Sequence, residues 1–599
     1  MIRVGNAQAF WGDRPSAALE LLAQEPALDY LTMDYLAEVS MSILALQRER
    51  DPNLGYAQDF VEVVRGLAEY WAAGGKCRLI ANAGGLNPIA CARACTAALE
   101  KAGCRSMKVG VVGGDDVLAA LMLSDPTSNA FQNLDSGLSL HCVRDRLLTA
   151  NAYLGCEGIV EALQAGADIV ITGRVADPAM VVAPCVYAFG WETTKLDATG
   201  LETTSWDRLA GATVAGHLLE CGTHVTGGIT TDWLDVPDPA HLGFPIAEIK
   251  SDGCCVITKS ELSGGCVTTE TVKEQLIYEI GDPDQYLSPD CTVSFLGIEV
   301  KSVGRNRVEV RGAQGRARPE TLKVSATYRD GFRAAGMLTV FGPQAVMKAR
   351  RCGEIVLQRL REAGHVYRDT IVECLGNAES VPVIHSAERS DALDEIVLRI
   401  AVESESKAAV EQFSREMIPL VTAGPQGTTG YAEGRPRVHG VIRYWPCLIE
   451  TERAQALVEF ISSVDRRSNR DQPAAWPPSY GRFPQASPSE FPSKNPIAFS
   501  DATCLADIAY GRSGDKGTGA NIGILIRSLQ NYDWLKHWLT AERVRHLFDP
   551  IGVTSVERYE MQSIGGFNFV IKGILRRGLR NDSQGKALAQ ALLSMPINA

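Results

Sequence analysis

The hydrophobic pattern of the first 180 residues alternates between short apolar runs and longer amphipathic stretches. The apolar runs occupy residues 1–4, 28–33, 77–80, 107–112 and 167–171. Apolar residues recur with a helical period in residues 17–22, 57–73, 89–102 and 155–165. Short apolar runs bounded by turn residues predict buried strands, and a period near 3.6 predicts helices. The alternation therefore predicts a doubly wound, mostly parallel α/β domain over residues 1–235.

The pattern changes further along the chain. Short strands rich in Val, Thr and Ile, separated by Gly, Asp and Pro, are predicted within residues 242–324. Helical periodicity returns at 342–363, and a strand at 396–404 precedes a helix at 407–417. We interpret residues 236–462 as a second α+β domain that begins with a β-rich part.

The last part of the chain divides into a linker and a small domain. Residues 463–500 are dense in Pro, Ser and charged residues and show no helical or strand period, which is typical of a linker. Strands and helices follow again in residues 501–599 and predict a small C-terminal α+β domain.

Composition narrows the class of protein. The length of 599 residues predicts roughly three to four domains. With 45% hydrophobic residues and no apolar run near the ~20 residues of a membrane span, we expect a soluble protein, and the absence of a leader pattern predicts the cytoplasm. The net charge of −12 disfavours nucleic-acid binding. The 16 cysteines are too sparse for a disulfide scaffold, so most are expected to be reduced core residues.

Several common catalytic motifs are missing. GTGANIG at 517–523 differs from the dinucleotide fingerprint by one residue, and GRSGDKG at 511–517 lacks the Gly-Lys-Ser/Thr ending of a phosphate loop. Neither a GxSxG elbow nor an HExxH pair occurs. These absences disfavour dehydrogenases, ATPases, serine hydrolases and zinc proteases.

Polar and glycine residues follow the predicted strands of the first domain. The carboxyl ends of parallel strands share one edge of a sheet, where ligands of open α/β folds bind. We therefore expect a ligand crevice there. Its predicted members are Asp34, Asn82, Gly84, Gly85, Gly113, Gly114, Arg174 and Asp177.

Catalytic roles are predicted for three of these residues. Arg174 suits an anion clamp and Asp177 an acid or base, although the two side chains would equally form a salt bridge that caps the next helix. Asp34 suits a general base or a metal carboxylate, with helix capping as the alternative. Asp34, Asp115, Asp116 and Asp177 together allow a divalent metal, but no local spacing requires one.

Substrate-binding roles are predicted for the others. Backbone amides at Asn82, Gly84 and Gly85 suit an oxyanion, unless the glycines only permit a tight turn. Glu220 and Thr226 lie beside two glycines that permit close approach of a ligand. The nearby His217, Cys221 and His224 are a weak zinc candidate, because Gly222 is expected to end the helix.

A second glycine-rich segment lies near the C-terminus. Ser513, Asp515 and Lys516 are predicted to lie in a turn between two strands. Such a turn can wrap an anion with its amides, with Lys516 supplying charge, or can serve as a domain-docking loop.

Five segments together resemble the acyclic terpene utilisation protein A family, in its long form with a ferredoxin-like domain fused at the C-terminus. They are NAGGLNP at 82–88, TGRVADPA at 172–179, GHLLECGTHVTGG at 216–228, SGGCVTTETVKEQLIYEIGDPDQYLSPD at 263–290 and RSGDKGTGANIG at 512–523. The resemblance implies a role in breaking down citronellol- and geraniol-type compounds, or related branched acids carried as CoA thioesters. It supplies no settled reaction.

Two functional hypotheses follow. The first is a cofactor-independent lyase or hydratase acting on a branched acyl-CoA or carboxylic acid, with CoA as part of the substrate. The second is a noncatalytic acyl-CoA-binding subunit or scaffold for another enzyme of the pathway. For a cytoplasmic enzyme of this kind, a homo-oligomer is the default expectation.

Overall fold

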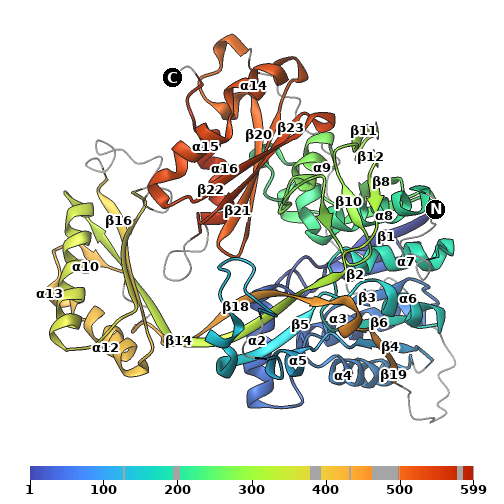
Figure 1. Cartoon of the computed structure of the whole chain (residues 1–599), viewed down its shortest axis with the longest axis horizontal. Coiled ribbons are helices and arrows are strands. Elements are labelled where there is room, and N and C mark those ends of the chain that lie inside the picture. The colour runs from blue at the N-terminus through green and yellow to red at the C-terminus, as the bar shows by residue number, and fades with distance from the viewer. Residues whose placement is uncertain are drawn as a thin grey trace. The chain divides into compact units, whose positions relative to one another are not determined.

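The computed structural model describes residues 1–104, 106–125, 129–192, 203–377, 379, 393–430, 434–461, 497, 499–575 and 584–597 (Figure 1). The chain forms two compact units. Unit 1 comprises Met1–Thr327, Trp445–Pro496 and Tyr559–Phe567. Unit 2 comprises Tyr328–Tyr444, Ile497–Arg558 and Asn568–Ala599. The linker expected at 463–500 lies almost entirely outside the described residues.

The centre of unit 1 is a parallel sheet formed by the five apolar runs of the N-terminal region. Its strands, in spatial order, are β1 (Ile2–Asn6), β2 (Tyr30–Met33), β3 (Arg78–Ala81), β6 (Ile169–Thr172) and β4 (Val109–Gly113). Almost every side chain of these strands is buried, as expected for a sheet covered on both faces. The predicted α/β fold of the N-terminal region is confirmed.

Antiparallel strands extend this sheet on both sides. Beside β1 lie β7 (Pro245–Ile249), β8 (Cys255–Lys259), β12 (Arg307–Arg311) and β11 (Glu299–Gly304). Beside β4 lies β19 (Leu457–Ile461). The sheet thus continues past residue 235, where the sequence suggested a domain boundary. Strands that follow the parallel strands in the sequence therefore pair with the edge strand β1 and extend the same sheet.

Helices cover the sheet in two groups. The helices α1 (Ala17–Gln24), α3 (Gln58–Ala72) and α4 (Pro88–Lys101) pack together, as do α6 (Glu157–Gln164), α7 (Ala179–Phe189) and α8 (Thr203–Glu220) (Figure 1). The connection from β4 back to β6 reverses the direction of strand addition. A right-handed crossover therefore places α6 on the face opposite α4. The neighbouring strands β3 and β6 are followed by helices on opposite faces of the sheet. A crevice forms at the carboxyl ends of two such strands.

Some elements of unit 1 were not predicted from the pattern. They are the helices α2 (Glu38–Arg50), α5 (Leu118–Met122) and α9 (Thr269–Leu276) and the strand β5 (Leu147–Ala152). The β-rich region expected within 242–324 also contains a small antiparallel sheet of β9 (Tyr286–Leu287), β10 (Thr292–Ser294) and β13 (Gln314–Arg316). The long strand β14 (Thr321–Phe341) pairs with β5 and then continues into unit 2.

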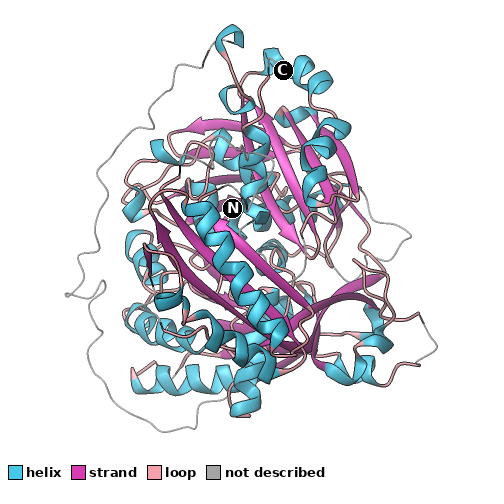
Figure 2. Ribbon diagram, turned by 90° about the vertical axis from the view of Figure 1, so that its left-hand side faces the viewer, coloured by secondary structure: helices cyan, strands magenta, loops and turns pink. Residues whose placement is uncertain are grey.

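The first part of unit 2 is an antiparallel sheet with helices on one face. The spatial order is β15 (Asp369–Leu375), β16 (Glu395–Ser404), β14 and β17 (Thr428–Thr429), and β18 (His439–Glu450) also pairs with β14. The helices α10 (Ala345–Glu362) and α12 (Lys407–Met417) pack against the sheet and each other, and α13 (Leu420–Ala423) follows (Figure 2). The order β14, α10, β15, β16, α12, β17 is the split β-α-β arrangement.

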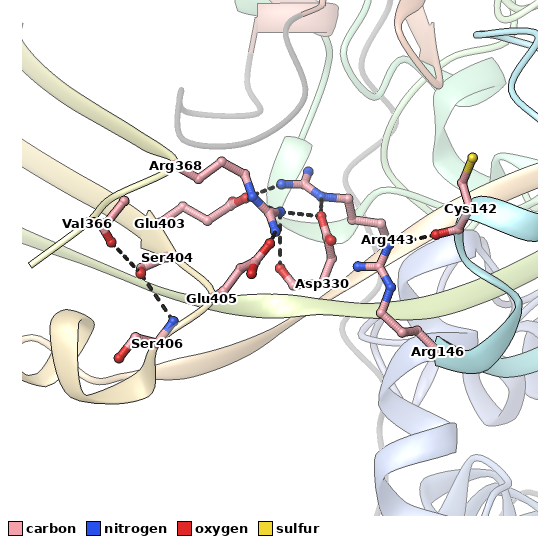
Figure 3. Close-up of polar contacts among 10 residues, drawn as sticks. All are labelled: Cys142, Arg146, Asp330, Val366, Arg368, Glu403, Ser404, Glu405, Ser406 and Arg443. Atoms are coloured by element: carbon pink, nitrogen blue, oxygen red, sulfur yellow. Dashed lines mark hydrogen bonds and ion pairs between the residues drawn. The ribbon is translucent and has the colours of Figure 1, made fainter.

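A network of charged side chains connects four segments of this sheet (Figure 3). Asp330 on β14 and Glu403 on β16 are buried carboxylates. Arg443 on β18 contacts both of them, and Arg368, just before β15, lies 2.6 Å from Asp330 and 3.2 Å from Glu403. Two guanidinium groups thus neutralise two carboxylates that would otherwise be costly to bury.

The C-terminal residues form a small antiparallel α+β domain, as the sequence predicted. Its sheet has the order β20 (Ala509–Lys516), β21 (Gly519–Ile526), β23 (Gly566–Lys572) and β22 (Ser555–Met561). Its helices are α14 (Tyr532–Trp538), α15 (Ala541–Phe548) and α16 (Gln584–Leu593). All 16 cysteines of the chain are free and most are buried, which confirms their expected role. None of the helices in the described part of the chain is long and apolar enough to cross a membrane.

Candidate functional site

Two polar side chains meet at the carboxyl edge of the parallel sheet. Asp34 follows β2 and Asn82 follows β3, and Asn82 Nδ2 donates a 2.7 Å hydrogen bond to Asp34 Oδ1. The backbone N–H of Leu36 donates to the same oxygen, and Asn82 Oδ1 accepts from the N–H of Tyr35 at 2.7 Å. Helix α2 begins with Ala37 as its N-cap, so Asp34 does not cap it. The amide of Asn82 instead fixes the orientation of the Asp34 carboxyl.

Arg174 and Asp177, which follow β6, complete the arrangement. Arg174 Nη2 lies 2.9 Å from Asp177 Oδ1, and Nη1 donates to the carbonyl oxygen of Leu36 next to Asp34. The guanidinium carbon lies 4.0 Å from the centre of the Tyr153 ring, within range of a cation–π interaction. The predicted salt bridge is thus present, and its arginine also contacts the β2 loop.

Exposure decides from which side a ligand reaches these residues. Arg174 and Asp34 are 3% and 4% exposed, and Asn82 is fully buried. The side chain of Asp177 is 32% exposed. A ligand that enters from solvent therefore meets Asp177 before Asp34.

Burial gives the two carboxyl groups different properties. It raises the pKa of Asp34 well above its usual range, and the charge of Asp177 raises this pKa further. Arg174 and the hydrogen bond from Asn82 oppose the increase without cancelling it. Asp34 is therefore favoured as a neutral, protonated acid beside an ion-paired Asp177.

Asp115 contacts the backbone of the site, whereas the sequence suggested it only as one of four aspartates that together allow a divalent metal. Its Oδ2 accepts hydrogen bonds from the Arg174 backbone N–H at 2.8 Å and from Asn151 Nδ2 at 2.7 Å. Burial raises its pKa to about 6. The exposed Asp116 instead accepts from the N–H of Leu118 at the start of α5. Within the described residues, no group of three or more His, Cys, Asp or Glu is arranged to hold a metal ion, so the four aspartates do not converge as a metal set.

The glycines at the strand ends have different roles. A Cβ on Gly84 would lie 2.5 Å from the Thr172 carbonyl oxygen, so this glycine lets the β3 and β6 loops approach closely. The buried Gly84 N–H donates to no group among the described residues, and Gly85 takes a positive φ of 52°. Gly114 packs against the Gln455 carbonyl, while Gly113 has open space around it. Gly84 is thus next to the candidate site, and Gly114 supports the contact with the β19 segment.

The predicted Glu220 lies in a second polar cluster. Glu220 Oε1 is 3.2 Å from His217 Nδ1, and His217 Nε2 is 3.0 Å from the Gln275 carbonyl oxygen. The His217 ring also contacts Tyr286, whose pKa is raised well above its usual range by burial and then by the charges of Glu220 and Asp177. Tyr286 thus connects this cluster electrostatically with Asp177, and no spacing pattern in the sequence signals that.

Other predicted residues have structural contacts. Helix α8 ends at Glu220, as Gly222 suggested, and the His217 ring lies between the Gln275 carbonyl oxygen at Nε2 and the Glu220 carboxylate on the Nδ1 side. Thr226 is fully buried and donates to the carbonyl oxygens of Gly243 and Thr223. These bonds stabilise the turn after α8.

The prediction of a turn at 512–516 was wrong. Residues Ala509–Lys516 form strand β20, and the turn is confined to 517–518. Ser513 Oγ donates to the Lys586 carbonyl oxygen and accepts from the Ala589 N–H, so it anchors helix α16. Asp515 is exposed, and the side chain of Lys516 lies outside the described residues. These three residues belong to unit 2, whereas the other predicted residues belong to unit 1.

Two family models together match nearly the whole chain. The family model described as acyclic terpene utilisation family protein AtuA matches residues 2–460. The chain belongs to the AtuA family. A second model, the AtuA ferredoxin-like domain, matches residues 503–598. No curated protein and no solved structure matches the chain. The AtuA family is implicated in acyclic terpene utilisation, and the Asp34–Arg174–Asp177 arrangement lies within the part that defines it.

Proposed function

We propose that this AtuA family protein is a cofactor-independent lyase or hydratase that acts on a branched acyl-CoA or branched carboxylic acid. One observation carries the proposal. A buried Asp34, whose pKa is raised, and an Asp177 paired with Arg174 lie around the same guanidinium group at the carboxyl edge of the sheet. A buried carboxyl group with a raised pKa is suited to act as an acid, and a neighbouring carboxylate paired with a cation is suited to act as a base.

The chemistry of a β-hydroxy acyl group fits these two groups. In the elimination direction, Asp177 takes the proton from the carbon next to the carbonyl, and Asp34 gives a proton to the departing hydroxyl. A carbon–carbon double bond and water result, and the two carboxyl groups exchange protonation states. Hydration is the reverse of this reaction. Each proton transfer requires a group within hydrogen-bond reach of the reacting atom.

The other residues of the site position these two. Arg174 holds Asp177 and keeps the ionised carboxylate stable, and Asn82 holds Asp34 through Oδ1. The N–H of Gly84 is suited to bind the oxyanion that forms on the thioester carbonyl when the proton leaves. Asp115 orients the backbone at Arg174 and touches no reacting atom in this scheme.

An assay with isotopic water tests the proposal. The full chain is incubated in H₂¹⁸O with an α,β-unsaturated, β-methyl-branched acyl-CoA, and label in the hydroxylated product is measured by mass spectrometry. Wild-type protein is expected to incorporate the label. Asp34→Asn and Asp177→Asn are expected to reduce the rate about 100-fold or more, since each removes one proton-transfer group. Asp145→Asn, at an exposed position of the short 3₁₀ helix Arg144–Arg146, is the control.

The same experiment separates the scaffold alternative. Saturable binding of the acyl-CoA without turnover in wild-type protein would support a noncatalytic binding subunit. Full activity in both site variants would reject the assignment of Asp34 and Asp177 even if the protein is an enzyme.

A further inference from the structure

A second concave site lies at the amino edge of the parallel sheet in unit 1. The cavity has a volume of about 550 Å³, within the usual range for small-molecule sites. Its wall consists of residues 26–30, residues 74–76, Arg78 and Tyr187. Tyr30 and Arg78 begin β2 and β3, whose other ends carry the candidate functional site. The two sites are therefore separated by the length of these strands.

The guanidinium group of Arg78 has no counter-ion among the described residues. Its carbon lies 5.0 Å from the centre of the Tyr187 ring, within range of a cation–π interaction that orients the group. Nη1 is covered by protein, whereas Nε and Nη2 keep accessible surface and donate to no group in the described part of the chain. A guanidinium group presents its N–H groups as a planar fork that matches an oxyanion. Two nitrogens of Arg78 are thus left for an anion in the cavity.

Tyr30 provides a second donor beside Arg78. The two residues are direct partners in the register of β2 and β3, so their side chains leave the sheet on the same face. Tyr30 is only 6% exposed, and its hydroxyl group, which keeps some accessible surface, has no hydrogen-bond partner within the described ranges. Burial raises the pKa of Tyr30 to about 12, so the hydroxyl group remains a donor at neutral pH. A largely buried hydroxyl group without a protein partner is suited to a ligand acceptor.

The charge balance of the wall indicates which anion fits. Lys76 is exposed and forms no ion pair with any described residue. Asp29 is the acidic residue of the wall, and its Oδ2 accepts a 2.7 Å hydrogen bond from the backbone N–H of Arg3. Lys76 and Arg78 against Asp29 leave one net positive charge. A singly charged carboxylate balances this charge better than a doubly charged phosphate ester.

We propose that this cavity binds an organic monocarboxylate through Arg78 and Tyr30. The carboxylate accepts from the guanidinium group of Arg78 and from the hydroxyl group of Tyr30. Pro26, Ala27 and Tyr187 provide apolar surface for the rest of the ligand. The site uses none of the residues assigned to acid–base chemistry and does not depend on the proposed function.

Calorimetric titration of the full chain with 3-phenylpropanoate tests the proposal. Saturable binding is expected, and the uncharged 3-phenylpropanamide should bind about tenfold more weakly or worse. Arg78→Met should weaken carboxylate binding about tenfold or more, since it removes the charged fork. Tyr30→Phe removes a hydroxyl group that bonds to no described residue, so it should weaken binding several-fold without lowering the Tm of the free protein. Arg93→Met, at an exposed position of α4 outside the cavity, is the matched charge control.

Amide hydrogen exchange locates the bound carboxylate. Protection is expected in peptides that cover residues 26–30 and 74–80. Protection confined to peptides with Asp34 and Arg174 would place the probe in the candidate functional site and overturn the proposal. So would the absence of saturable binding at millimolar probe, or unchanged affinity in both cavity variants. Binding of inorganic phosphate with the same sensitivity to the variants, and no binding of the carboxylate, would show a phosphate site and also overturn it.

Discussion

At the scale of single residues, the candidate site is built from carboxyl groups in environments that disfavour their charge. Asp34 and Asp115 are both buried, and burial is the largest cause of their raised pKa values. Asp177 is part-exposed and paired with Arg174. Buried carboxyl groups such as Asp34 and Asp115 reduce folding stability when they are ionised, and active sites commonly retain them because catalysis needs them.

Asp115 allows this cost to be measured. Its pKa changes from 3.8 to about 6 on folding, so between these values the folded protein binds more protons than the unfolded chain. The free energy of unfolding therefore falls as the pH rises through this window, by about 3 kcal/mol for this group. Asp115→Asn, which retains an acceptor for Arg174 and Asn151, removes this loss.

The expected result is a pH-dependent change in Tm. Relative to wild type, the Tm of Asp115→Asn should rise between pH 4 and about pH 6 and stay constant above. Thermal unfolding monitored by circular dichroism across this range measures it. Asp145→Asn reports the effect of losing an exposed charge. A difference in Tm that does not vary with pH would contradict the assignment.

The sequence predicted part of the site at this scale. Asp34, Asn82, Arg174 and Asp177 follow apolar strands, and strand ends in a parallel sheet share one edge, so their convergence could be predicted. The contributions of Asp115, Tyr153 and Tyr286 could not, because they depend on contacts between segments far apart in the chain. The glycines around Ser513 favoured the prediction of a turn, but this segment forms a strand.

At the scale of elements, the close approach of the β3 and β6 loops brings Asn82 and Arg174 to one place. Gly84 makes this approach possible, since its neighbours are the Thr172 carbonyl and Pro88. The helices after β3 and β6 lie on opposite faces of the sheet. A side chain at Gly84 would therefore force apart the two loops that carry the site.

Two glycine variants test this contact. Gly84→Ala places a Cβ 2.5 Å from a backbone oxygen that cannot turn away, and we expect a loss of about 1–3 kcal/mol in the free energy of unfolding. Gly113→Ala, at the end of β4, meets nothing within 4 Å and is expected to change it by less than about 0.5 kcal/mol. Urea unfolding midpoints measure both. Equal stability of the two variants would show that the loops are not in tight contact.

Strands and helices could be predicted wherever their apolar residues follow a regular strand or helix period. The five parallel strands coincide with the five apolar runs, and the helix predicted at 407–417 is α12. Helix α2 was missed because its polar and apolar residues follow no clear helical period. The strands β7, β8 and β12 were expected in a second domain, because no local pattern tells which sheet edge a strand joins.

At the scale of the whole molecule, the chain leaves unit 1 along β14 and returns to it at Trp445. Arg443 lies just before this return and contacts both Asp330 and Glu403, whose side chains are 10% and 2% exposed. Arg368 is another cation beside these carboxylates, and it is more exposed. Removal of Arg443 takes a paired cation away from two buried carboxylates.

We expect Arg443→Met to destabilise the sheet of unit 2 by on the order of 3 kcal/mol, since breaking a buried ion pair leaves an uncompensated charge. Amide hydrogen exchange should accelerate in peptides from β14 and β16 and remain unchanged in β1, β2 and β3, because the two units have separate cores. Arg351→Met, which removes an exposed pair with Glu354 on α10, is the control and should cost less than about 1 kcal/mol. Adding Glu403→Gln to Arg443→Met should restore part of the lost protection, because it removes the carboxylate left without Arg443. Faster exchange throughout both units would instead show that the chain unfolds as a single cooperative body.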